Sequence, residues 1–72
     1  MQTLGQKISF YRKNLRISQE ELAFRTRTGV QKIQLIENDQ LVPSKEMLLK
    51  LSTVLEVPVS ELEIDRTHSA IH

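Results

Sequence analysis

Cysteine is absent from the chain, which excludes disulfide bonds and thiolate metal sites. The two histidines, His68 and His72, stand in a polar tail without other ligating residues nearby, so we expect no metal and no other cofactor. No stretch approaches the roughly 18 apolar residues of a membrane span, and no basic segment followed by an apolar run marks a secretory signal. These absences predict a cytoplasmic protein without a membrane partner.

The residue patterns of common enzyme sites are also missing. The sequence has no glycine-rich phosphate loop, no paired carboxylates in an apolar setting and no Ser/His/Asp set outside the polar tail, so we expect no enzyme. What remains is 72 residues with 39% hydrophobic and 26% charged residues, which is typical of one small globular domain. We place this domain at residues 1–64 and expect residues 65–72 to form a polar, disordered tail.

Charge is distributed unevenly along the sequence, although the net charge is only +1. Residues 1–35 contain seven basic and two acidic side chains and carry +5, whereas residues 36–72 contain three basic and seven acidic side chains and carry −4. A basic half favours contact with phosphates and hence with nucleic acid. An ordinary solvated charge distribution explains the same asymmetry equally well, so charge alone does not decide the function.

Helix start signals recur along the sequence. Serine or threonine N-caps followed by apolar residues at helical spacing predict helices over residues 4–14, from 19 to 25 or 26, and over 45–55, with the caps Thr3, Ser18 and Ser44. Ser18 and Glu21 also have the spacing of a full capping box. A weaker signal at Thr28 or Gly29 predicts one more helix, which reaches about Asn38.

Apolar spacing indicates which side of each helix faces the core. The inward residues of the first helix are Leu4, Ile8 and either Tyr11 or Phe10. The helix over 45–55 has a broad apolar stripe of Met47, Leu48, Leu51, Val54 and Leu55. Pro58 begins a short fifth helix with the apolar residues Val59, Leu62 and Ile64. The sequence thus predicts a compact all-α fold of five helices.

The segment 18–37 predicts two short helices joined by a turn. Leu22 and Ala23 mark the inner face of one helix, and Ile33 and Ile36 mark that of the other. A small, polar stretch between them interrupts the apolar stripe. The outer side of the second helix is left open and carries Val30, Gln31, Lys32, Gln34 and Leu35. Such a helix-turn-helix offers its second helix to the major groove of DNA.

Six motifs follow one another over residues 4–62: LGQKI, YRK, ISQEELA, KIQLIE, VPS before LLKLSTVL, and VPVSEL. This series resembles the phage-repressor type of helix-turn-helix domain, the lambda-repressor-like, Cro-like or XRE family of bacterial and phage transcription regulators. The resemblance implies a five-helix domain that binds double-stranded operator DNA as a homodimer. It further implies a sequence-specific transcriptional regulator, in the first instance a repressor, whose third helix enters the major groove.

The resemblance also implies which residues contact DNA. The base-reading positions fall on Val30, Gln31, Gln34 and Leu35, with Lys32 close by. The phosphate-contacting positions fall on Ser18, Gln19, Arg25, Arg27 and Asn38, with Arg16 and Lys32 as further charges. Glutamine amides suit adenine and the two apolar side chains suit thymine methyls, so we expect a half-site rich in A and T. Plain solvent exposure is the alternative interpretation of the base-reading side chains and of Gln19, whereas the role of helix cap alone is the alternative for Ser18.

Arg12 and Glu37 match an arginine of helix one and a glutamate ending helix three that pair in several family members. A partly buried pair would fix the third helix against the first, and removal of one partner would leave a charge without compensation. We therefore expect a scaffold role, with phosphate contact by Arg12 as the alternative.

The chain departs from the family pattern at three positions where glycine is frequent, occupied by Arg16, Arg27 and Asp39. Arg27 lies in the turn between the two helices of the motif. A residue with a Cβ in the left-handed conformation costs about 1 kcal/mol. Either the turn accepts this strain or it has another shape.

Apolar side chains outside the expected core form a candidate dimer edge of Leu41, Val42, Val59, Leu62 and Ile64. We expect a homodimer, but the same edge suits the docking of a missing C-terminal regulatory domain. It also leaves open a second function, that of a protein-interaction or antitoxin-like dimerisation module of the same fold. Steep salt dependence of duplex binding would distinguish the DNA-binding regulator from such a module.

Overall fold

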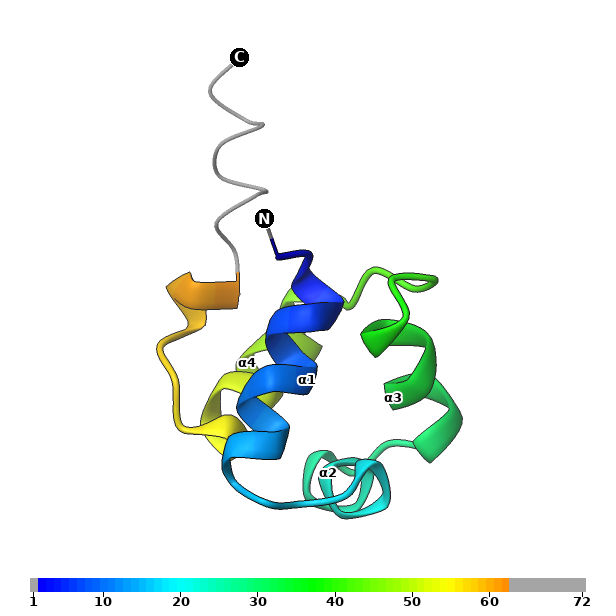
Figure 1. Ribbon diagram of the computed structural model, residues 1–72. Coiled ribbons are helices and arrows are strands. Elements are labelled where there is room, and N and C mark those ends of the chain that lie inside the picture. Colours follow the sequence, from blue (N-terminus) through cyan, green and yellow to red (C-terminus); the bar gives the residue numbers. More distant parts are fainter. Residues whose placement is uncertain (1, 63–72) are drawn as a thin grey trace.

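The structure, a computed structural model, describes residues 2–62 and contains helices but no strand in that range (Figure 1). The elements are α1 (Leu4–Asn14), α2 (Gln19–Thr26), α3 (Val30–Glu37), α4 (Lys45–Leu55) and the 3-10 helix η1 (Val59–Leu62). The all-helical fold and the bounds of the first four helices agree with the sequence prediction. The count of five α-helices is not confirmed, because the fifth element is a 3-10 helix within the described residues. Ile64 and the tail expected over 65–72 lie outside them.

Side-chain caps begin three of the four α-helices. The Thr3 side chain accepts a hydrogen bond from Gln6 N, and the Gln6 side chain accepts one from Thr3 N, which completes a capping box. Ser18 and Ser44 likewise accept hydrogen bonds from the backbone three residues ahead. The full capping box expected at Ser18 was wrong, because the Glu21 carboxylate accepts from Arg25 Nε at 2.7 Å instead. Helix α3 begins at Val30 and follows Gly29, an N-cap residue that offers no side-chain hydrogen bond.

Left-handed residues follow all four α-helices, and none of them is glycine. Their φ angles are 60° for Arg16, 57° for Arg27, 61° for Asp39 and 62° for Glu56. Each is the left-handed residue of a Schellman motif. In this motif the N–H of the following residue donates to the carbonyl five residues before it, as from Thr28 N to Ala23 O at 2.9 Å. The left-handed conformation thus occurs at Arg16, Arg27 and Asp39, the three positions where the family favours glycine. The sequence did not indicate it at Glu56.

One hydrophobic core joins the helices, with α4 in contact with α1, α2 and η1. Its buried apolar residues are Ile8, Leu22, Ala23, Ile33, Ile36, Met47, Leu48, Leu51, Leu55 and Leu62. Tyr11 packs against this core while Phe10 is half exposed, which settles which of the two faces inward. None of the described helices is long and apolar enough to cross a membrane.

Hydrogen bonds fasten η1 to α1. Tyr11 Oη donates to Glu61 Oε1 at 3.2 Å, and Lys7 Nζ donates to Glu61 O at 3.3 Å. Burial raises the pKa of Tyr11 above 10.0, and the hydrogen bond to Glu61 and the charge of Glu61 act in the same direction. The end of the described chain is thereby tied to the first helix.

The start of α1 lies against the end of α3. A Cβ at Gly5 would lie 2.5 Å from Glu37 O and 2.6 Å from Ile36 O, so the two helices approach at a distance that only glycine permits. Asp39 strengthens this contact, because its carboxylate accepts from Gly5 N at 2.9 Å and from Thr3 Oγ1 at 2.6 Å. Asp39, two residues after the end of α3, therefore caps α1 from outside.

Candidate nucleic-acid interface

Helices α2 and α3 form a helix-turn-helix through the short turn at Arg27 and Thr28 (Figure 1). The left-handed conformation of Arg27, with φ 57° and ψ 48°, ends α2 and reverses the chain. Thr26 is buried, and its hydroxyl donates to Leu22 O at 2.8 Å, so the polar end of α2 is satisfied internally. The turn thus has the expected place in the sequence with arginine at its left-handed position.

The outer side of α3 is open, whereas its inner side is fully packed. Ile33 and Ile36 are buried, but Gln31, Lys32, Gln34 and Leu35 are exposed. Asn38 continues the stripe of residues 31, 34 and 35 by one further turn of the helix. Val30 differs from the other base-reading candidates, because it is only partly exposed and packs against the core.

The phosphate candidates occupy different environments. Ser18 and Arg27 are exposed, and Arg25 is exposed but paired with Glu21. Asn38 is exposed at the C-cap of α3. Gln19 is half-buried, and its Nε2 donates to Glu37 Oε1 at 3.0 Å. The sequence did not indicate this contact, because its partners lie 18 positions apart and belong to two helices.

A largely buried ion pair joins α1 to the end of α3. Arg12 Nε lies 2.7 Å from Glu37 Oε2 and Arg12 Nη2 lies 3.1 Å from Glu37 Oε1, with side chains only 11% and 5% exposed. Arg12 Nη1 also donates to Ile17 O at 2.9 Å, in the segment that leads into α2. Together with the Gln19 contact, this pair makes Glu37 the point at which α1, α2 and α3 are held together.

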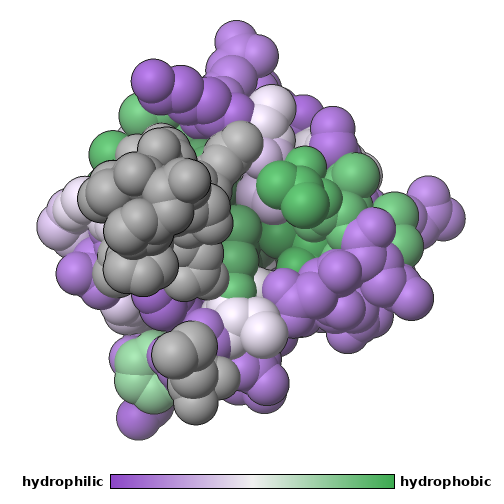
Figure 2. Space-filling model, turned by 90° about the horizontal axis from the view of Figure 1, so that it is seen from above, coloured by the Kyte–Doolittle hydropathy of each residue, from purple (hydrophilic) through white to green (hydrophobic). Residues whose placement is uncertain are grey.

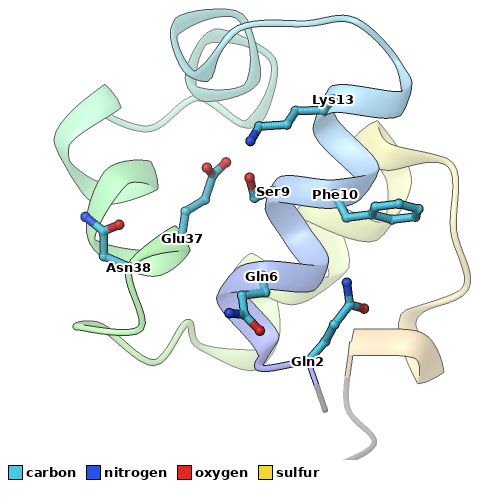
Figure 3. Close-up of a pocket in the computed structure, with 7 residues that line it drawn as sticks. All are labelled: Gln2, Gln6, Ser9, Phe10, Lys13, Glu37 and Asn38. Atoms are coloured by element: carbon cyan, nitrogen blue, oxygen red, sulfur yellow. The ribbon is translucent and has the colours of Figure 1, made fainter.

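A hollow of about 510 Å³ lies between α1 and the end of α3 (Figure 3). Its lining residues are Gln2, Gln6, Ser9, Phe10, Lys13, Glu37 and Asn38. In Figure 3 Lys13 and Ser9 extend from α1 toward Glu37. No sequence pattern marks Ser9 or Lys13 as site residues, because only the packing of α1 against α3 brings them to this edge.

The candidate dimer edge is only partly available at the surface. Val42 is largely exposed, whereas Leu41 and Val59 are half-buried against the core. Leu62 is 2% exposed and belongs to the core, so its assignment to the edge was wrong. Ile64 lies outside the described residues. Figure 2 shows an apolar patch on the face where the loop between α3 and α4 lies.

Comparison with known proteins agrees with this geometry. The helix-turn-helix family model matches residues 8–62. The chain is also similar to the P22 c2 repressor protein in its crystal structure with synthetic operator 9T, with 31% sequence identity, a TM-score of 0.82 and coverage of 86% of this chain and 94% of that one. No curated protein matches the chain. The chain therefore belongs to the helix-turn-helix family of the phage-repressor type.

Proposed function

We propose that this protein is a sequence-specific regulator of transcription that binds double-stranded DNA, acts as a repressor and inserts α3 into the major groove. The observation that carries the proposal is the division of α3 into a fully buried side, Ile33 and Ile36, and an exposed stripe through Gln31, Gln34 and Leu35. Similarity to a repressor in complex with its operator supports the same function.

The exposed stripe has the chemistry of base recognition. Glutamine amides can bind N6 and N7 of adenine together, and a good contact of this kind discriminates by about 1–3 kcal/mol. Leu35 is suited to contact a thymine methyl group, while Val30 has less surface to offer because it packs against the core. The half-site should therefore be rich in A and T.

Phosphate contacts would flank this stripe. The start of α2 near Ser18 presents backbone N–H groups and the positive end of a helix dipole to an anion. Arg27 and Asn38 follow at the turn and at the end of α3. Two copies on adjacent half-sites, paired near Val42, would give the homodimer that the family implies.

Selection of bound sites from a random duplex library tests the proposal, followed by affinity measurements at fixed salt. Gln31→Ala with Gln34→Ala should weaken binding to the selected site far more than binding to random duplex. Leu35→Ala should behave similarly, whereas Leu49→Ala on α4 is a matched control, since the two leucines are 42% and 47% exposed. Equal losses on both duplexes would refute base reading by α3. Partner binding that duplex competitor leaves unchanged would favour the protein-interaction module instead.

A further inference from the structure

One face of α1 meets the end of α3 around the hollow of Figure 3. The face consists of Gln6, Ser9, Phe10 and Lys13, which are spaced as i, i+3, i+4 and i+7. Phe10 is half exposed, and its ring packs edge-on against the Tyr11 ring, with centroids 5.6 Å apart. The remaining wall is the end of α3, and most of the lining offers hydrogen-bond donors.

The charge of this hollow is set by Lys13. Glu37 also lines it, but both of its carboxylate oxygens accept hydrogen bonds from Arg12, and one accepts from Gln19 as well. Within residues 2–62 two ion pairs form, and Lys13 belongs to neither. The Glu37 carboxylate is thus compensated by its own partners, and the exposed ammonium group of Lys13 remains in the lining with the Ser9 hydroxyl of the same helix. This combination suits an anion.

The position of the hollow indicates which anion. Asn38 is both a wall of the hollow and the next residue of the exposed stripe on α3, so the two surfaces are continuous. A helix with its side chains is about 10–12 Å wide, and the major groove is about 12 Å wide. A seated α3 would fill the groove, and the hollow at its flank would then lie over the sugar-phosphate backbone.

We propose that this hollow binds a backbone phosphodiester of the operator, with Lys13 as its cation and Ser9 as a neutral donor. The inference rests on the proposed function and adds α1 to the elements that contact DNA. It assigns Lys13 a contact that carries no sequence information, because every duplex offers the same phosphate.

The test compares Lys13→Met with Lys50→Met, a matched substitution of an exposed lysine on α4. Affinities for the selected operator and for random duplex are measured from about 50 mM to about 200 mM salt. Loss of one phosphate contact lowers the slope of log K against log salt by about 0.9, so the affinity deficit of Lys13→Met should shrink about 3.5-fold over this range, equally on both duplexes. Lys50→Met should leave slope and affinity unchanged.

Further measurements separate this contact from a structural role. Lys13 lies in the last turn of α1, where a cation also stabilises the helix dipole. Lys13→Arg should restore the slope, and ethylation of one backbone phosphate should interfere with binding of the wild type but not of Lys13→Met. An unchanged slope for Lys13→Met, or a loss confined to the operator, would overturn the phosphate site while leaving the proposed function intact. Failure of the wild type to bind any duplex would overturn both.

Discussion

Helix α4 begins with a serine cap and buries Met47, Leu48, Leu51, Ser52 and Leu55 along eleven residues. Helix α3 has eight residues, follows a glycine N-cap that gives no side-chain hydrogen bond, and buries only Ile33 and Ile36. Short helices without caps are marginal in water, and their stability comes from tertiary contacts. The comparison shows that the helix proposed to bind DNA is the one with less local support.

Contacts at the C-terminal end of α3 compensate for its lack of local support. Glu37 is bound by Arg12 and Gln19, and Asp39 is bound to the start of α1. Helix α4 makes no comparable buried ion pair within the described residues. The outer face of α3 can stay open although its C-terminal end is bound, because the contacts of Glu37 and Asp39 use the side of α3 that faces α1. Substitutions that remove these supports should therefore affect α3 more than equivalent changes in α4.

The largest effect is expected for Glu37→Ala. It leaves the Arg12 guanidinium buried without its carboxylate, which should lower the free energy of unfolding by about 3–5 kcal/mol in urea titrations. Glu46→Ala, which removes an exposed carboxylate from the first turn of α4, should change it by less than about 1 kcal/mol. Replacement of both partners, Arg12→Met with Glu37→Met, should recover much of the loss. A harmless Glu37→Ala would show that the pair does not hold α3.

Gly5→Ala should have the next largest effect. It should destabilise the protein, although intrinsic helix propensity alone predicts a gain in stability. Alanine in a helix interior is ordinarily better than glycine by about 0.5–1 kcal/mol. Here the added Cβ meets the Glu37 and Ile36 carbonyls, which are backbone atoms, so α1 must move away from α3. We expect a net loss of about 1–3 kcal/mol in thermal or urea unfolding. A gain in stability would mean that α1 and α3 are not closely packed.

Much of the fold could be predicted because its signals are local. The caps at Thr3, Ser18 and Ser44 act on amides three residues away, so the helices they begin could be located from sequence spacing. A left-handed turn at Arg27 was one of two alternatives that the sequence left open, because the family favours glycine there. Glu56 adopts the same conformation without any residue signal that distinguishes it from a helical glutamate.

The supports of α3 could not be predicted in the same way. Asp39 reaches Thr3 and Gly5 across 36 and 34 positions, and these contacts exist only after α1 has packed against α3. The hollow at Lys13 has the same origin. Leu62 was assigned to a surface edge because it is an apolar residue near the end of the domain, but it is part of the core. Spacing indicates which residues share a face but not which face another element covers.

Arg27→Gly should raise the stability of the protein but weaken its binding to DNA. Glycine adopts the left-handed conformation without a Cβ, so we expect a gain of about 1 kcal/mol, or about 4–8 °C in Tm for a domain of this size. Glu56→Gly makes the same change after α4 and should give a similar gain. Only Arg27→Gly should also weaken duplex binding, because a cation next to α3 is lost. A fall in Tm for Arg27→Gly alone would show that the arginine side chain stabilises the turn.

The smallest effect is expected at the N-cap of α3. Gly29 has the extended backbone of a cap, with φ −78° and ψ 148°, and a Cβ there would meet nothing within 4 Å. Gly29→Ser should therefore add a cap to α3 and stabilise the protein by a few tenths of a kcal/mol, while Ser44→Ala should remove about 1 kcal/mol by deleting the cap of α4. Native-state hydrogen exchange distinguishes local from global gains. If local opening limits exchange in α3, the serine should slow it there and leave α4 unchanged. Equal slowing in both helices would contradict the view that α3 has its own weak start.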